Sequence, residues 1–68
     1  QWAIAKRGLT YRLMNRYEEA LQDFNQAIEL DPKDQWAIAN RGLTYQSMER
    51  YEEALQDLNQ AIELDPKY

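Results

Sequence analysis

The chain has 68 residues, 8 of them basic and 12 acidic, with a net charge of −4 and neither Cys nor His, so it makes at most one small domain with a limited core. The acidic balance argues against nucleic acid or an anionic membrane surface as a partner. The missing thiols and imidazoles exclude disulfides, the usual transition-metal sites and Ser-His or Cys-His catalysis, which leaves only carboxylates as catalytic candidates.

Apolar residues recur at helical spacing in two groups within the first half of the chain, which predicts helices over about residues 2–14 and 18–30. Between these helices, Asn15 tolerates the left-handed backbone conformation that ends a helix. Pro32 cannot continue a helix and therefore terminates the second one. Asp34 then stands at a position where its side chain caps the next helix.

The same pattern returns at an offset of 34 residues, and two copies of this unit fill the chain. The repetition predicts two more helices over about residues 36–48 and 52–64, and thus two repeats, 1–34 and 35–68. At the turn the second copy carries Glu49, and a left-handed Glu is strained, so we expect this turn to be less stable or to differ in geometry. Six aligned positions differ: Lys6/Asn40, Arg12/Gln46, Leu13/Ser47, Asn15/Glu49, Phe24/Leu58 and Asp34/Tyr68.

Each unit carries small, apolar and proline residues at fixed positions. These are Gly8, Tyr11, Ala20, Phe24, Ala27 and Pro32 in the first copy and Gly42, Tyr45, Ala54, Leu58, Ala61 and Pro66 in the second. This pattern of two helices in 34 residues resembles the tetratricopeptide repeat. The resemblance implies an all-α fold of tandem helix-turn-helix repeats, an α-solenoid with a right-handed superhelix. Two positions depart from the family pattern: Ile4 and Ile38 stand for its early Trp, and Arg7 and Arg41 for its Leu before the Gly.

Antiparallel pairing of the two helices of a repeat sets Gly8 opposite Phe24, so the helices are expected to approach closely there. The arginine beside each glycine comes toward an aspartate of the second helix, and a partly buried guanidinium needs a carboxylate partner. The expected ion pairs are Arg7 with Asp23 and Arg41 with Asp57. The alternatives are an anion site and, for Arg41, a pairing with Glu29 or Asp31.

The remaining carboxylates lie mostly on the solvated faces of the predicted second helices, among Gln and Asn residues. Acid and base catalysis by paired carboxylates needs a cleft that separates their pKa values. We therefore expect no catalytic residue, no enzymatic activity, no metal site and no cofactor.

One stripe of the first helix in each copy points away from the Gly8 seam. In tetratricopeptide repeats such stripes line a concave wall that binds extended peptides, so the resemblance implies a protein-interaction scaffold. Lys6 and Arg12 make the first stripe basic, which suits a peptide with acidic residues or a free carboxylate. Three of the six differences fall on the stripe, although free drift of exposed positions explains them equally well. The stripes are Trp2, Ala5, Lys6, Leu9, Arg12 and Leu13, and Trp36, Ala39, Asn40, Leu43, Gln46 and Ser47.

Self-association is the alternative function, because a single repeat cannot bury its apolar face alone. We expect the last helix to expose Leu55, Ile62 and Leu64, on which a second copy stacks end to end. A chain that begins with Gln1 rather than Met is also expected to be a fragment, a processed product or a designed model repeat with no dedicated ligand. Its longest apolar run has four residues, so we expect no membrane segment and a cytoplasmic location.

Overall fold

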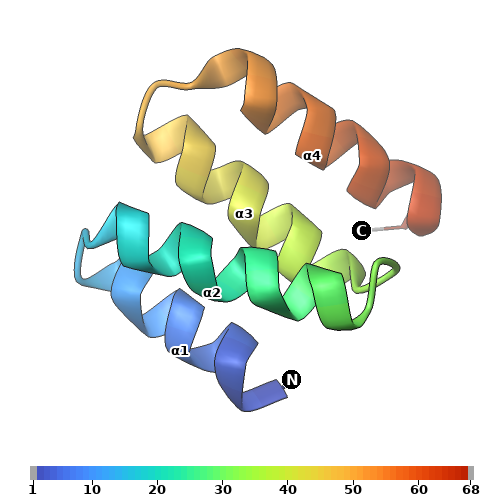
Figure 1. Cartoon of the computed structure of the whole chain (residues 1–68). Helices are drawn as coiled ribbons and strands as arrows, with labels where there is room; N and C mark the ends of the chain where they lie inside the picture. The colour runs from blue at the N-terminus through green and yellow to red at the C-terminus, as the bar shows by residue number, and fades with distance from the viewer. Residues whose placement is uncertain (1, 68) are drawn as a thin grey trace.

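Four helices form the chain in the computed structural model, which describes residues 2–67 (Figure 1). They are α1 (Trp2–Leu13), α2 (Tyr17–Leu30), α3 (Gln35–Ser47) and α4 (Tyr51–Leu64). Every boundary lies within one residue of the range predicted from the sequence, and residues 2–67 contain no strand. The all-α fold class is thus confirmed. The outermost residues of the two predicted repeats, 1 and 68, lie outside the described part of the chain.

The helices form two antiparallel pairs, α1 with α2 and α3 with α4, that pack one after the other (Figure 1). Helix α3 packs against both α2 and α4, and its beginning also meets α1. Helix α4, by contrast, packs along α3 and along no other helix within residues 2–67. The first helix of the second repeat is therefore the centre of the molecule, and α1 and α4 lie at its two ends.

The two turns inside the repeats have the same backbone geometry. Asn15 and Glu49 both adopt the left-handed conformation, with φ of 63° and 62°. The expectation of a different geometry in the second turn is therefore wrong, and the expectation of strain at Glu49 stands. In the first turn the Tyr17 hydroxyl also donates a hydrogen bond of 2.9 Å to Asn15 Oδ1.

The linker between the repeats ends α2 and starts α3 as the sequence predicts. Asp31 is extended at φ −146°, which breaks the helical backbone just before Pro32. Three residues on, the Asp34 carboxylate accepts a 3.1 Å hydrogen bond from the Ala37 N–H and so caps α3. This cap determines where α3 begins and hence which of its side chains face α1.

Within each repeat, the two helices are closest at the glycine. A Cβ added at Gly8 would lie 3.0 Å from Phe24 Cε1, and one added at Gly42 would lie 3.1 Å from Leu58 Cγ. Phe24 has no exposed surface, and the alanines one turn away on either side of it, Ala20 and Ala27, are also fully buried. Small residues against a large one thus allow the close contact that this core needs.

An arginine and an aspartate join the helices of each pair beside this contact. Arg7 donates from Nε and Nη2 to the two carboxylate oxygens of Asp23, both at 2.8 Å. Arg41 makes the same fork to Asp57 at 2.8 and 2.7 Å. These are the two pairs named from the sequence, and the hydrogen bonds that Arg41 donates to Asp57 raise the pKa of Arg41 above its ordinary value.

Arg41 has a further partner that the sequence did not indicate. Its Nη1 donates a 2.9 Å hydrogen bond to Asn25 Oδ1 on α2, so one guanidinium links three helices. The carboxylates proposed as alternatives, Glu29 and Asp31, are not its partners. Arg41, which has the extra partner, is also the more buried arginine: 22% of its side chain is exposed, compared with 61% of the Arg7 side chain.

Relief of the strain at the second turn should stabilise the protein. Glu49→Gly removes the left-handed penalty and is expected to add about 1 kcal/mol to the free energy of unfolding, or roughly 4–8 °C in Tm. Thermal unfolding followed by circular dichroism measures the change. Asn15→Gly is the matched control and should gain less, because Asn already tolerates this conformation and its bond to Tyr17 is lost. A gain at residue 15 equal to that at residue 49 would contradict the strain.

The two ion pairs should differ in their contribution to stability. Arg41→Met keeps the apolar stem but leaves the buried Asp57 carboxylate without its guanidinium and Asn25 without its donor, which should cost about 1–3 kcal/mol. Arg7→Met should cost less, since Arg7 is mostly exposed and bonds to Asp23 alone. Urea unfolding of both variants compares the losses in the free energy of unfolding. A larger loss for Arg7→Met would show that the hydrogen bond from Arg41 to α2 does not stabilise the protein.

Candidate functional site

The stripes predicted to line a groove lie on α1 and α3, and their residues differ in exposure. On α1, Lys6 and Leu13 are exposed, and Leu9 and Arg12 are half-buried. On α3, Gln46 and Ser47 are exposed, whereas Trp36 and Leu43 are half-buried. The open part of the surface therefore belongs mainly to α1 and to the C-terminal end of α3.

Three residues of the stripes are not on the open surface, which corrects the expectation for them. Asn40 is only 5% exposed, and its Nδ2 donates a 2.9 Å hydrogen bond to the Trp36 carbonyl one turn earlier. Ala5 and Ala39 are buried in the core clusters. Asn40 is interior because α3 is covered by neighbouring helices on both sides, whereas its counterpart Lys6 on α1 is exposed; the two alanines are buried in both repeats.

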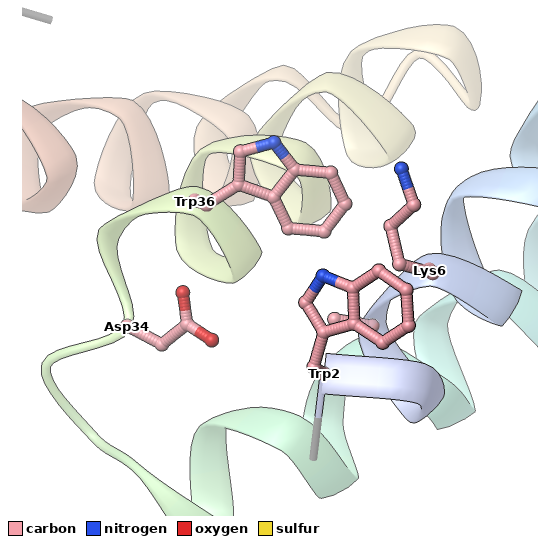
Figure 2. Close-up of a pocket in the computed structure, with 5 residues that line it drawn as sticks. Trp2, Lys6, Asp34 and Trp36 are labelled. Carbon is pink, nitrogen blue, oxygen red and sulfur yellow. The ribbon is translucent and has the colours of Figure 1, made fainter.

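A pocket of about 400 Å³ opens between the beginning of α1 and the beginning of α3 (Figure 2). The residues that line it are Trp2, Ala5, Lys6, Asp34 and Trp36. Figure 2 shows the two indoles beside each other, with Lys6 from α1 on one side and the Asp34 carboxylate from the linker on the other. The pocket thus joins the two stripes through an aromatic pair.

The two tryptophans make walls of different rigidity. The Trp36 ring packs edge-on against the buried Phe24, with 6.4 Å between ring centroids and 72° between the planes. Trp2 is exposed, and its ring has the Lys6 ammonium 6.0 Å from its centroid. Because Trp36 is fixed by its packing and Trp2 is exposed, the Trp2 side can move to fit the side chain of a ligand.

Two of the cations that have no carboxylate partner lie in this region. Within residues 2–67, Arg7, Arg16, Arg41 and Arg50 each form an ion pair, while Arg12 and Lys6 form none. The Arg12 Nε is buried and has no hydrogen-bond partner in the described chain. The stripe of α1 therefore presents two charges that the fold does not use.

Asp34 is the pocket residue that sequence reasoning missed. It was read as a helix cap, and the structure gives it both that role and a place on the pocket wall. The available signal was its position two residues before Trp36, since a capping side chain and the first turn of its helix lie close together.

The described residues form neither a metal-binding cluster nor a membrane-spanning helix. Residues 2–67 hold no group of three or more acidic side chains placed to bind a metal ion. None of their helices has the length and hydropathy needed to cross a membrane.

Comparison with known proteins identifies the family of the chain but no individual relative. No curated protein matches the sequence. The family model of the tetratricopeptide repeat matches it twice, over residues 2–34 and 36–68. These two matches cover both glycine contacts and all four helices except Gln35, the first residue of α3. The chain therefore belongs to the tetratricopeptide repeat family, whose members are non-enzymatic protein-interaction repeats.

Proposed function

We propose that the chain binds an extended peptide along α1 and α3, with an apolar or aromatic side chain of the peptide in the Trp2–Trp36 pocket and an acidic group beside Lys6 and Arg12. The observation that carries this proposal is the pocket itself, in which two indoles from successive repeats adjoin a lysine without an ion pair. The smaller hollow on α1, by contrast, is lined by Arg7, whose guanidinium is paired with Asp23.

The apolar part of the site fits a single side chain. Its volume of about 400 Å³ lies at the small end of the range for ligand pockets. Two tryptophans supply large apolar faces with few rotatable bonds, so little conformational freedom is lost when a ligand packs between them. An aromatic or branched aliphatic side chain meets these demands best.

The charges around the pocket give the peptide a direction. Lys6 lies on one side and Asp34 on the other, so a carboxylate is favoured toward Lys6 and disfavoured toward the linker. The net charge of −4 repels an acidic ligand at long range. This repulsion is screened beyond about 8–10 Å at physiological salt, whereas a direct contact with Lys6 or Arg12 is not.

The second repeat contributes polar rather than charged contacts. Gln46 and Ser47 are exposed on α3 at the positions that correspond to Arg12 and Leu13 on α1. An extended peptide has a free N–H and C=O at each residue, and an amide and a hydroxyl bind such groups without selecting a charge. The acidic group of the ligand is therefore expected over the first repeat and its neutral part over the second.

Peptide binding can be tested with a random library of extended peptides screened against the unmodified chain. The tightest binder is then titrated by tryptophan fluorescence, since both tryptophans of the protein line the pocket. Lys6→Ala and Arg12→Ala should each weaken binding by about tenfold or more, because each removes a charge-assisted contact.

Lys33→Ala provides the matched control, since it removes one positive charge from the exposed linker, outside the pocket. It should leave the affinity unchanged. A library that yields no binder, or equal losses from all three variants, would contradict the proposal. Association between copies, the second function considered from the sequence, is tested separately by sedimentation of the chain without peptide.

A further inference from the structure

The contact between α2 and α3 shows how one repeat covers the next. Leu21 of α2 is 6% exposed, and Ile28 of α2 packs against a buried cluster that contains Ile38 of α3. Beside them, Arg41 Nη1 donates its hydrogen bond to Asn25. Because the two repeats are nearly identical, this contact is a template for what the outer helices can bind.

On α4 the counterparts of these residues are uncovered. Leu55, the counterpart of Leu21, is 56% exposed, and Ile62, the counterpart of Ile28, is 51% exposed. Asn59 corresponds to Asn25, and both side chains are exposed, but only Asn25 accepts a hydrogen bond from an arginine of the next repeat. We call this surface of α4 the tail face; its sequence is that of a covered face, but here no helix lies on it (Figure 1).

The outer surface of α1 is the complementary half of the template. Ala37 and Thr44 are fully buried on α3, whereas their counterparts Ala3 and Thr10 are exposed on α1. Arg7 bonds to Asp23 through Nε and Nη2, the atoms that Arg41 uses for Asp57, and makes no bond like that of Arg41 to Asn25. We call this outer surface of α1 the head face. It carries a hollow of about 180 Å³ that is lined by Ala3, Ile4 and Arg7.

We propose that the head face of one copy docks on the tail face of a second copy, so that α1 lies on α4 as α3 lies on α2. Ile62 of the second copy then fills the hollow and contacts Ile4, as Ile28 packs near Ile38. Arg7 donates from Nη1 to Asn59 of the second copy, and Trp2 covers Leu58 as Trp36 covers Phe24. The contact joins two different faces and can repeat along a chain of copies.

Leu55, Ile62 and Leu64 are all exposed, as expected from the sequence, but the proposed contact does not include Leu64. Its counterpart Leu30 remains 60% exposed although α3 covers α2. An apolar side chain that stays exposed in the covered repeat would bury little surface under a docked helix. The tail face thus consists of Leu55, Leu58, Asn59 and Ile62, without Leu64.

Lys6 is the one mismatch between the head face and its template. At the same position α3 has Asn40, which is buried and satisfied by the Trp36 carbonyl. A lysine there must keep its ammonium in water while its stem is covered, which costs free energy that an asparagine does not. Lys6 therefore weakens the stacking of copies, and its replacement by Asn completes the match.

Sedimentation of the 68-residue chain from about 10 μM to about 1 mM tests this arrangement. The unmodified chain should associate only toward the upper end of that range, and Lys6→Asn should tighten association about tenfold or more. Ile62→Asp should abolish association. Leu64→Asp, which adds the same charge to the same helix, should leave it unchanged, and circular dichroism checks that each variant is helical.

A mixing experiment in the Lys6→Asn background distinguishes head-to-tail contact from a symmetric dimer. Ala3→Asp blocks the head and Ile62→Asp blocks the tail, so each variant alone should be monomeric. An equimolar mixture should form a one-to-one dimer, since one good head meets one good tail. The proposal is overturned if the mixture stays monomeric. It is also overturned if Ile62→Asp and Leu64→Asp weaken association equally, or if Lys6→Asn associates no more tightly than the unmodified chain.

Discussion

The burial of α3 between neighbours on both sides is the constraint on which the rest of the structure depends. A single helix pair has only one interior, and it lies between its two helices. Adding a second pair buries a further set of α3 side chains, among them Ala37, Ile38 and Thr44. The residues of α1 with the same identities stay on or near the surface because no described helix packs on their outer side. Stability, groove and free ends all follow from this asymmetry.

The same packing builds the groove. The Asp34 cap determines where α3 starts, and the contact with Phe24 holds Trp36 against the first repeat. Trp36 therefore faces Trp2 across a pocket whose inner wall is rigid. Arg7 and Arg41 pair with the aspartates beside the glycine contacts, whereas Lys6 and Arg12 on the stripe of α1 have no carboxylate partner.

Residue 6 and its counterpart 40 show how one position acquires two roles. From the sequence, the change from Lys6 to Asn40 indicated a position in the groove where ligand binding selects the residue. The structure places Asn40 in the interior, where its amide bonds to the Trp36 carbonyl and a lysine would be costly. Asn40 is thus explained by the fold, while Lys6, exposed beside Trp2, remains available to a ligand or a second copy.

The sequence by itself determined the repeat, the four helices, the glycine contacts and the two arginine–aspartate pairs, because each depends on spacing within one 34-residue unit. Only the tertiary structure decided that Asn40 is buried while Lys6 is exposed and that Arg41 reaches Asn25. Identical residues in the two repeats meet different neighbours. Burial depends on those neighbours, which a local pattern does not encode.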